Sequence, residues 1–166
     1  SCNTGTFHES MNMAATLKVP LVAVIENNLY GMSVPFSGSE VDGTRCASSI
    51  KDIAVRSVAY NVPGMIVDGQ DVLAVFLAVR KAVERARRNG EMTMIECKSY
   101  RWYGHGRSDP RAYRTKAEEK AWHDRDPITV LRNKLASEGF CTEEEMDRIK
   151  DKSFATIEAA TQFATD

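Results

Sequence analysis

Residues 21–32 read Leu21-Val22-Ala23-Val24-Ile25-Glu26-Asn27-Asn28-Leu29-Tyr30-Gly31-Met32, and this stretch decides the fold that the sequence predicts. Five apolar residues are followed at once by a carboxylate, two carboxamides and a turn that contains glycine. A short apolar run with polar residues after it is typical of a strand that is buried on both faces of a parallel sheet. Ligands of open α/β sheets bind at the carboxyl ends of such strands. The two asparagines therefore either form an ordinary turn or contribute to a ligand site, and the local sequence leaves both open.

Helices and strands alternate on both sides of this first strand. Apolar periodicity predicts helices at residues 6–17, 49–59 and 71–88, and further short strands at 65–67 and 93–99. The 71–88 helix is the clearest, with an apolar stripe made by Val72, Val75, Phe76, Val79 and Val83. This alternation predicts an α/β fold in which a parallel sheet is flanked by helices.

The last third of the chain is predicted to consist of helices. Thr115 with Glu118 and Thr142 with Glu145 both fit the capping box that begins many helices. The last helix has an apolar face that we expect to pack against the rest of the protein. This face is formed by Met146, Ile149, Ile157, Ala160 and Phe163. We expect residues 1–114 to form part of an α/β domain and residues 115–166 to form a helical C-terminal extension.

Composition excludes several classes of protein. The 166 residues are 43% hydrophobic and 27% charged with a net charge of -1, which favours a globular domain and no nucleic-acid partner. No apolar run approaches the roughly 20 residues that span a membrane. The first apolar run begins at Val19 and is broken by Pro20, so we expect no signal peptide. The four cysteines form no C-x-x-C pair, which favours reduced thiols in the cytoplasm. The chain opens on Ser1 without an initiator methionine, so we expect a fragment.

Two polar loops, 29–45 and 100–114, each follow a predicted buried strand. The second contains Tyr100-Arg101-Trp102-Tyr103-Gly104-His105-Gly106-Arg107-Ser108-Asp109-Pro110. A histidine between two glycines has room to approach a ligand, and arginines on either side suit phosphate oxygens. A surface histidine is the alternative. The functional hypothesis is favoured because both loops begin at the same edge of the predicted sheet.

Three segments together resemble the α subunit of thiamine-diphosphate-dependent 2-oxo acid and acetoin dehydrogenases, the first components of multienzyme complexes. They are Asn3-Thr4-Gly5-Thr6-Phe7-His8-Glu9-Ser10, the stretch from Glu26 to Met32, and the stretch from Tyr100 through Asp109-Pro110 to Tyr113-Arg114. The resemblance covers essentially the whole chain in the family's order. It implies a thiamine-diphosphate-binding fold, a β subunit as partner in an α2β2 assembly, and cleavage of pyruvate, another 2-oxo acid or acetoin. The acyl group would then pass to a lipoyl-bearing acyltransferase component.

The resemblance also implies a set of site residues. Thiamine diphosphate would be bound through Mg²⁺, a cation that prefers about six oxygen ligands, with the side chain of Asn28 and the backbone carbonyl of Tyr30 among them. His105 matches the family histidine that contacts the diphosphate near the reacting centre. Arg101 matches a loop arginine that braces this segment, and Met32 falls where the family chain passes the cofactor ring.

The chain also departs from the family pattern. The family's Gly-Asp-Gly triplet, which supplies a further magnesium ligand, is absent from this sequence. Ser1 matches the residue directly after that triplet, and the resemblance therefore implies that Ser1 lies beside the cofactor. We therefore expect this piece alone to bind cofactor weakly and to be inactive. Gly106 stands where mitochondrial relatives have a regulatory phosphoserine, which favours a bacterial-type enzyme. Two alternatives are an inert fragment that acts only in subunit assembly and an unrelated doubly wound nucleotide or flavin module. The nucleotide or flavin alternative is weakened because such modules usually carry a G-x-G-x-x-G motif, and this sequence has none.

Overall fold

The structure, a computed structural model, describes residues 2–37 and 46–165. In chain order the elements are α1 (Gly5–Thr16), β1 (Val22–Asn27), β2 (Tyr30–Gly31), β3 (Val34–Pro35), the 3₁₀ helix η1 (Ile53–Tyr60), β4 (Gly64–Asp68), α2 (Val72–Asn89), β5 (Thr93–Lys98), α3 (Lys116–His123), α4 (Pro127–Ser137) and α5 (Glu143–Thr165). They divide into two units, residues 1–126 and residues 127–166, and each is described by itself.

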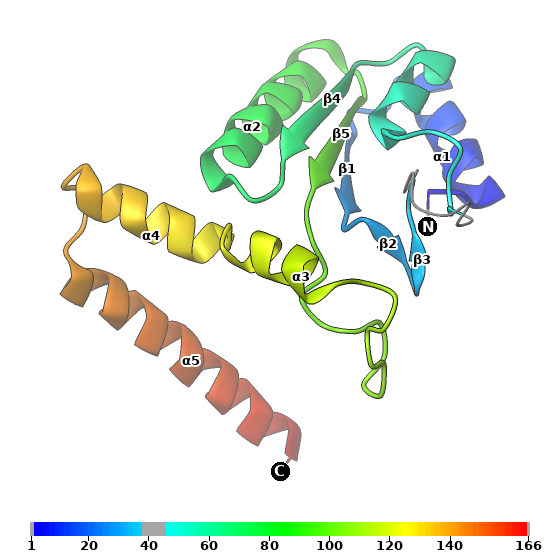
Figure 1. The fold of residues 1–166 in the computed structure, drawn as a ribbon. Coiled ribbons are helices and arrows are strands. Elements are labelled where there is room, and N and C mark those ends of the chain that lie inside the picture. The colour runs from blue at the N-terminus through cyan, green and yellow to red at the C-terminus, as the bar shows by residue number, and fades with distance from the viewer. Residues whose placement is uncertain (1, 38–45, 166) are drawn as a thin grey trace. The chain divides into compact units, whose positions relative to one another are not determined.

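Strand β5 is the centre of the main sheet. Within the described residues this sheet has the strand order β1-β5-β4 (Figure 1). Both neighbours run parallel to β5, with Val22 opposite Thr93 on one side and Gly64 opposite Met94 on the other. Residues 93–97 are all buried, as expected for a strand covered on both faces. The predicted α/β fold with a parallel sheet flanked by helices is therefore confirmed.

Successive side chains of β5 enter two different apolar cores. Met94 packs with Met11 of α1 and Ile53 of η1, whereas Ile95 packs with Ala82 of α2. Since side chains alternate between the faces of a strand, these two cores lie on opposite faces of the sheet. Figure 1 accordingly shows α2 on one side of the sheet and α1 with η1 on the other.

Helix α2 begins and ends as its sequence predicts, and its packing face overlaps the predicted stripe only in part, through Val75 and Val79. The Asp71 carboxylate accepts the backbone N–H groups of Leu73 and Ala74 at 2.9 and 3.0 Å, and Gly90 ends the helix with a left-handed φ of 64°. Phe76, predicted to pack, is 59% exposed. The buried positions are Ala78, Ala82 and Ala86. Small side chains at four-residue intervals let a helix lie close to a sheet, so the packing face centres on alanines beside the predicted valine stripe.

The predicted irregular loop at residues 29–45 begins instead with a small hairpin. β2 and β3 are antiparallel, with Tyr30 opposite Pro35 and Gly31 opposite Val34. The prediction is therefore wrong for this stretch, because strands of two residues are too short to show an alternating pattern. Residues 38–45 lie outside the described part of the chain. The helix expected at 49–59 is present as the 3₁₀ helix η1.

The second unit contains α4 and α5. Arg132 of α4 donates to Glu143 at 2.8 Å and to Asp147 at 2.8 Å, which joins the two helices. Thr142 and Glu145 form the predicted capping box, with each side chain accepting the other residue's backbone N–H. Of the predicted packing face only Met146 is buried, whereas Ile149, Ile157 and Phe163 are exposed. No helix formed by residues 2–37 and 46–165 is both long and apolar enough to cross a bilayer.

Candidate functional site

The two polar loops leave the sheet side by side. Asn27 ends β1 opposite Lys98, which ends β5. The pairing continues for one more residue, since Ser99 N–H donates to the Asn27 carbonyl at 2.9 Å. Both loops therefore start at the carboxyl edge of neighbouring parallel strands, which is where open α/β sheets bind ligands.

The first turn is built by its own asparagine side chains. Asn27 Oδ1 accepts the Leu29 N–H at 3.1 Å, and Asn28 Oδ1 accepts the Tyr30 N–H at 3.2 Å. These are Asx turns, and they allow Leu29 to adopt a left-handed φ of 70°. The other end of the Asn27 carboxamide donates to the buried Glu96 carboxylate at 2.6 Å. The position of Asn28 is therefore tied to the core of the sheet.

The backbone carbonyl of Tyr30 takes no part in the hydrogen bonds between β2 and β3. Phe36 N–H donates to the Leu29 carbonyl at 2.8 Å, so the Tyr30–Pro35 pair is of the type that exchanges no hydrogen bonds. The N–H and carbonyl of Tyr30 consequently point away from β3, toward the edge where Asn28 Oδ1 receives that N–H. Two neutral oxygens, the Asn28 carboxamide and the Tyr30 carbonyl, thus face the same edge.

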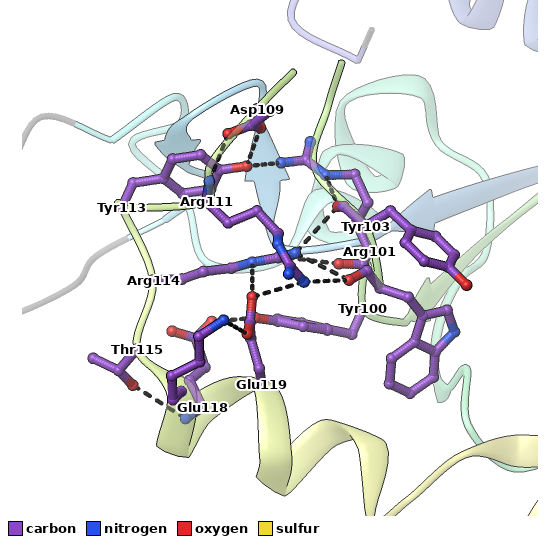
Figure 2. Close-up of polar contacts among 12 residues, drawn as sticks. Tyr100, Arg101, Tyr103, Asp109, Arg111, Tyr113, Arg114, Thr115, Glu118 and Glu119 are labelled. Carbon is purple, nitrogen blue, oxygen red and sulfur yellow. Dashed lines mark hydrogen bonds and ion pairs between the residues drawn. The ribbon is translucent and has the colours of Figure 1, made fainter. Parts of the chain in front are cut away.

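A buried arginine organises the second loop from inside. The Arg114 side chain is fully buried, and its guanidinium donates to the carbonyls of Arg101, Trp102 and Tyr103 at 2.6, 3.1 and 3.1 Å. It also pairs with Glu119 of α3 at 3.0 Å (Figure 2). One cation therefore satisfies three successive carbonyls of an irregular segment, which would otherwise be costly to bury.

Asp109 closes the tip of the same loop. Its carboxylate accepts the backbone N–H of His105 and of Arg111, each at 2.8 Å, and the Tyr113 hydroxyl at 2.7 Å. The Tyr113 hydrogen bond, followed by these two backbone N–H groups, lowers the pKa of Asp109 to about 2. A Cβ at Gly104 would lie 2.6 Å from the Asp109 Cβ, so the closed tip requires glycine there. The backbone of His105 is fixed, while its residue remains exposed.

Arg101 joins the two loops. One of its terminal nitrogens donates to the Met32 carbonyl at 2.7 Å and to the Tyr113 hydroxyl at 2.6 Å. The ring of Tyr30, from the first loop, also contacts the second loop, since its centroid lies 5.4 Å from that of the Tyr113 ring. The guanidinium carbon of Arg101 lies 5.9 Å from the Tyr30 ring centroid. Figure 2 shows Arg101, Tyr113 and Asp109 as a continuous chain of polar contacts.

Glu118 holds two tyrosines from the other side. Thr115 Oγ1 accepts the Glu118 N–H at 3.1 Å, as a capping box predicts. The Glu118 carboxylate, however, accepts the hydroxyls of Tyr30 at 2.7 Å and Tyr100 at 3.1 Å. Burial, and then the Glu118 carboxylate, raise the pKa of Tyr30, and the same causes raise the pKa of Tyr100 to about 12. Both hydroxyls therefore stay protonated as donors.

The structure brings several predicted site residues together. Asn28 and Tyr30 share one turn, and Arg101 contacts the Met32 carbonyl directly. The Met32 residue itself is 63% exposed at a left-handed φ of 59°. His105 stands on the loop that Arg101 anchors. Ser1 lies outside the described residues.

Sequence reasoning assigned no site role to Glu96 or Glu118, although both hold the first turn. For Glu96 a signal was present, namely a carboxylate in the middle of a buried strand. Within residues 2–37 and 46–165, no cluster of three or more His, Cys, Asp or Glu side chains could hold a metal.

Known proteins resemble this chain over almost its whole length. Residues 1–166 match the family model described as "Dehydrogenase E1 component". The α subunit of acetoin:2,6-dichlorophenolindophenol oxidoreductase of Bacillus subtilis is 41% identical over 166 residues, which is 99% of this chain and 46% of that protein. The α subunit of the pyruvate dehydrogenase E1 component of Rhizobium meliloti is 38% identical, with 96% of this chain and 43% of that protein covered. The chloroplastic pyruvate dehydrogenase E1 subunit alpha-3 of Oryza sativa is 37% identical, with coverage of 99% and 37%. The chain thus spans less than half the length of these curated relatives.

Proposed function

Because the chain belongs to the dehydrogenase E1 component family, we propose that it is the α-subunit portion of a thiamine-diphosphate-dependent dehydrogenase. The enzyme cleaves pyruvate, another 2-oxo acid or acetoin and passes the acyl group to a lipoyl domain. The observation that best supports this function is the Arg101 bridge to the Met32 carbonyl. It joins the loop of His105 to the turn of Asn28 at the ligand-binding edge of a parallel sheet.

The oxygens at this edge fit a magnesium ion that is bound to a diphosphate. Mg²⁺ prefers hard oxygen ligands and is commonly held by a few protein groups together with phosphate oxygens and water. Asn28 Oδ1 has one lone pair for the Tyr30 N–H and a second for a metal, and the Tyr30 carbonyl faces the same edge. These two oxygens are neutral, so the anionic ligands come from the diphosphate and from groups outside this chain.

Within this proposal each loop residue has a distinct task. Thiamine diphosphate, when bound, supplies an electron sink for breaking the carbon–carbon bond next to a carbonyl. His105 would contact the diphosphate and assist proton transfer near the reacting centre, since it is an exposed residue whose backbone N–H is held by Asp109. Arg101 holds this loop in place, and Met32 borders the cofactor ring. Ser1 belongs to the cofactor-binding set through its place in the family motif.

The remaining parts of the active site come from partners. We propose a β subunit in an α2β2 assembly and a lipoyl-bearing acyltransferase as acceptor. The location is cytoplasmic, in keeping with Cys2, Cys46, Cys97 and Cys141, all of which are free thiols. A chain that acts only in subunit assembly is the competing hypothesis. The exposed apolar residues Ile149, Ile157 and Phe163 of α5 favour it, since they suit a protein interface.

A titration separates these two functions. The full-length α subunit, alone and with its β subunit, is titrated with thiamine diphosphate in the presence and absence of Mg²⁺. We expect saturable, Mg²⁺-dependent binding to the assembly. His105→Ala should then sharply reduce acylation of a lipoyl domain in the same assembly. An assembly that forms normally and binds no cofactor would support the assembly role and refute the enzymatic one.

A further inference from the structure

Glu96 is a buried charge that the proposed function leaves unexplained. It lies in the central strand β5 between Ile25 of β1 and Ile66 of β4, and none of its surface is exposed. A buried carboxylate is strongly unfavourable unless it is paired and fully hydrogen-bonded. An apolar side chain at this position would pack in the sheet without the cost of burying a charge. The carboxylate therefore indicates that its hydrogen bonds are needed here.

The carboxylate is satisfied by three donors from three parts of the chain. Asn27 Nδ2 donates to it at 2.6 Å, Ala54 N–H at 2.8 Å and Lys98 Nζ at 2.7 Å. Lys98 also pairs with Asp52 at 2.9 Å. Burial alone would lower the pKa of Lys98, but the hydrogen bonds with Asp52 and Glu96 outweigh it, and the pKa is raised. The ammonium therefore stays charged and compensates the buried carboxylate.

Glu96 determines which way the Asn27 carboxamide points. An ionised carboxylate only accepts hydrogen bonds, so Asn27 must direct its NH₂ toward Glu96 and its oxygen toward the Leu29 N–H. That second bond stabilises the left-handed Leu29, a conformation that is unfavourable for a non-glycine residue. Asn28 lies between these two residues, so the direction of its side chain depends on the turn that Glu96 holds.

We propose that Glu96 is a positioning residue of the magnesium–diphosphate site, acting through Asn27 to aim the Asn28 carboxamide oxygen and the Tyr30 carbonyl at the metal. This inference rests on the proposed function. Residues that orient metal ligands from behind typically change metal affinity or activity by about 10–100-fold when they are replaced.

The test is the isosteric change Glu96→Gln in the full-length α subunit assembled with its β subunit. Glu96 Oε1 accepts from both Asn27 and Lys98, and Oε2 accepts from Ala54. A carboxamide must place its NH₂ group against one of these sets of donors, and even where its oxygen faces Asn27 the bond is weaker, because the acceptor is no longer charged. We expect the Mg²⁺ concentration that half-saturates cofactor binding, measured by calorimetry, to rise about 10–100-fold. Asp52→Asn is the matched control, because it removes the negative charge beside Lys98 and leaves the Glu96–Asn27 bond intact. Its half-saturating Mg²⁺ concentration should equal that of the wild type.

A double exchange distinguishes positioning from stability. Asn27→Asp with Glu96→Gln keeps the net charge and reverses the direction of the hydrogen bond. The new carboxamide on β5 would donate to one oxygen of the new carboxylate on β1, while the other oxygen accepts the Leu29 N–H. We expect this double variant to recover most of the Mg²⁺ affinity that Glu96→Gln loses. If Glu96→Gln does not assemble, Asn27→Ser replaces it, because serine keeps an acceptor near Leu29 and cannot reach Glu96. It should show the same loss of affinity.

The outcomes separate this inference from the function on which it rests. Wild-type Mg²⁺ affinity in Glu96→Gln, or in Asn27→Ser where that variant is used, would overturn the positioning role and leave the enzymatic function intact. A double variant that melts at the wild-type temperature and binds Mg²⁺ as weakly as Glu96→Gln would overturn it too. A wild-type assembly that binds no Mg²⁺ and cofactor would refute the proposed function itself.

Discussion

Replacing Arg101 with Met should loosen the loop of His105 without disturbing the sheet. Arg101 donates to the carbonyls of Met32 and Tyr103 at 2.7 and 3.2 Å and to the Tyr113 hydroxyl at 2.6 Å. Methionine keeps an unbranched apolar stem and removes all three donors, together with the guanidinium that lies near the Tyr30 ring.

The size of the effect follows from these contacts. A hydrogen bond from a charged donor contributes about 1.5 kcal/mol or more when buried, and the partial exposure of Arg101 reduces each one to roughly half of that. Three such bonds amount to about 2 kcal/mol, or roughly a 30-fold change in an equilibrium constant. The ratio of open to closed loop should rise by this factor. Cofactor affinity falls only to the extent that the open form becomes populated.

Hydrogen exchange measures this opening directly. The His105 N–H donates to Asp109, and Asp109 is held by Tyr113, which receives a hydrogen bond from Arg101. Exchange of that amide should become about 30-fold faster in Arg101→Met. The Met94 amide of β5, bonded to the Pro63 carbonyl at 2.9 Å, should not change.

Arg88→Met removes the same charge from the exposed last turn of α2 and serves as the control. Exchange of the His105 amide in Arg101→Met within about threefold of the wild type would refute the assignment of Arg101 as the residue that joins the two loops.

Three further changes probe other contacts. Asp109→Asn should speed proteolysis of residues 104–111, because a carboxamide has one oxygen for three donors. In the wild type the pKa of Asp109 is lowered, so the stabilisation of the loop by the Asp109 carboxylate is complete above the ordinary pKa of 3.8 and is lost only as pH falls through about 2. Loss of amide protection in the loop at a higher pH would contradict this assignment. Glu118→Gln should lower the pKa of Tyr100 from about 12 in a tyrosinate absorbance titration, though not to the value of free tyrosine, because burial remains. An unchanged value would exclude Glu118 as a cause. Thr142→Ala should destabilise the second unit by about 1 kcal/mol in urea unfolding, whereas Thr156→Ala, within α5, should have little effect.

Secondary structure was largely predictable because its causes are local. β1 is a short apolar run, β5 is a short stretch that alternates and is rich in Thr, Met and Ile, and α2 has a cap at Asp71 and a glycine at its end. The hairpin of Tyr30 with Pro35 was not predictable, since two-residue strands have no period. The packing face of α2 was predicted to centre on its valines, whereas it centres on the neighbouring positions Ala78, Ala82 and Ala86. Large apolar residues suggest a packing face in the sequence, but a helix that lies close to a sheet needs small ones.

The site was predictable only where a contiguous motif contains it. Asn28 and Tyr30 lie in one motif, and His105 and Arg101 in another, so the resemblance to a known family located both loops. The bond from Arg101 to the Met32 carbonyl spans 69 residues, and no local pattern encodes it. Glu118 was assigned to a helix cap because its N–H makes that bond, while its carboxylate acts elsewhere.

The register of the sheet explains why the partners of Glu96 could not be predicted from sequence, although the buried carboxylate itself was visible there. Glu96 and Lys98 are two residues apart on β5, so their side chains leave the same face of the sheet. Asn27 lies opposite Lys98 on β1 and therefore shares that face. The three side chains meet only if β1 and β5 are neighbours, parallel and aligned in this one register. A shift by one residue would turn Asn27 to the other face, so the contact follows from the pairing of strands about 70 residues apart and from no property of either strand alone.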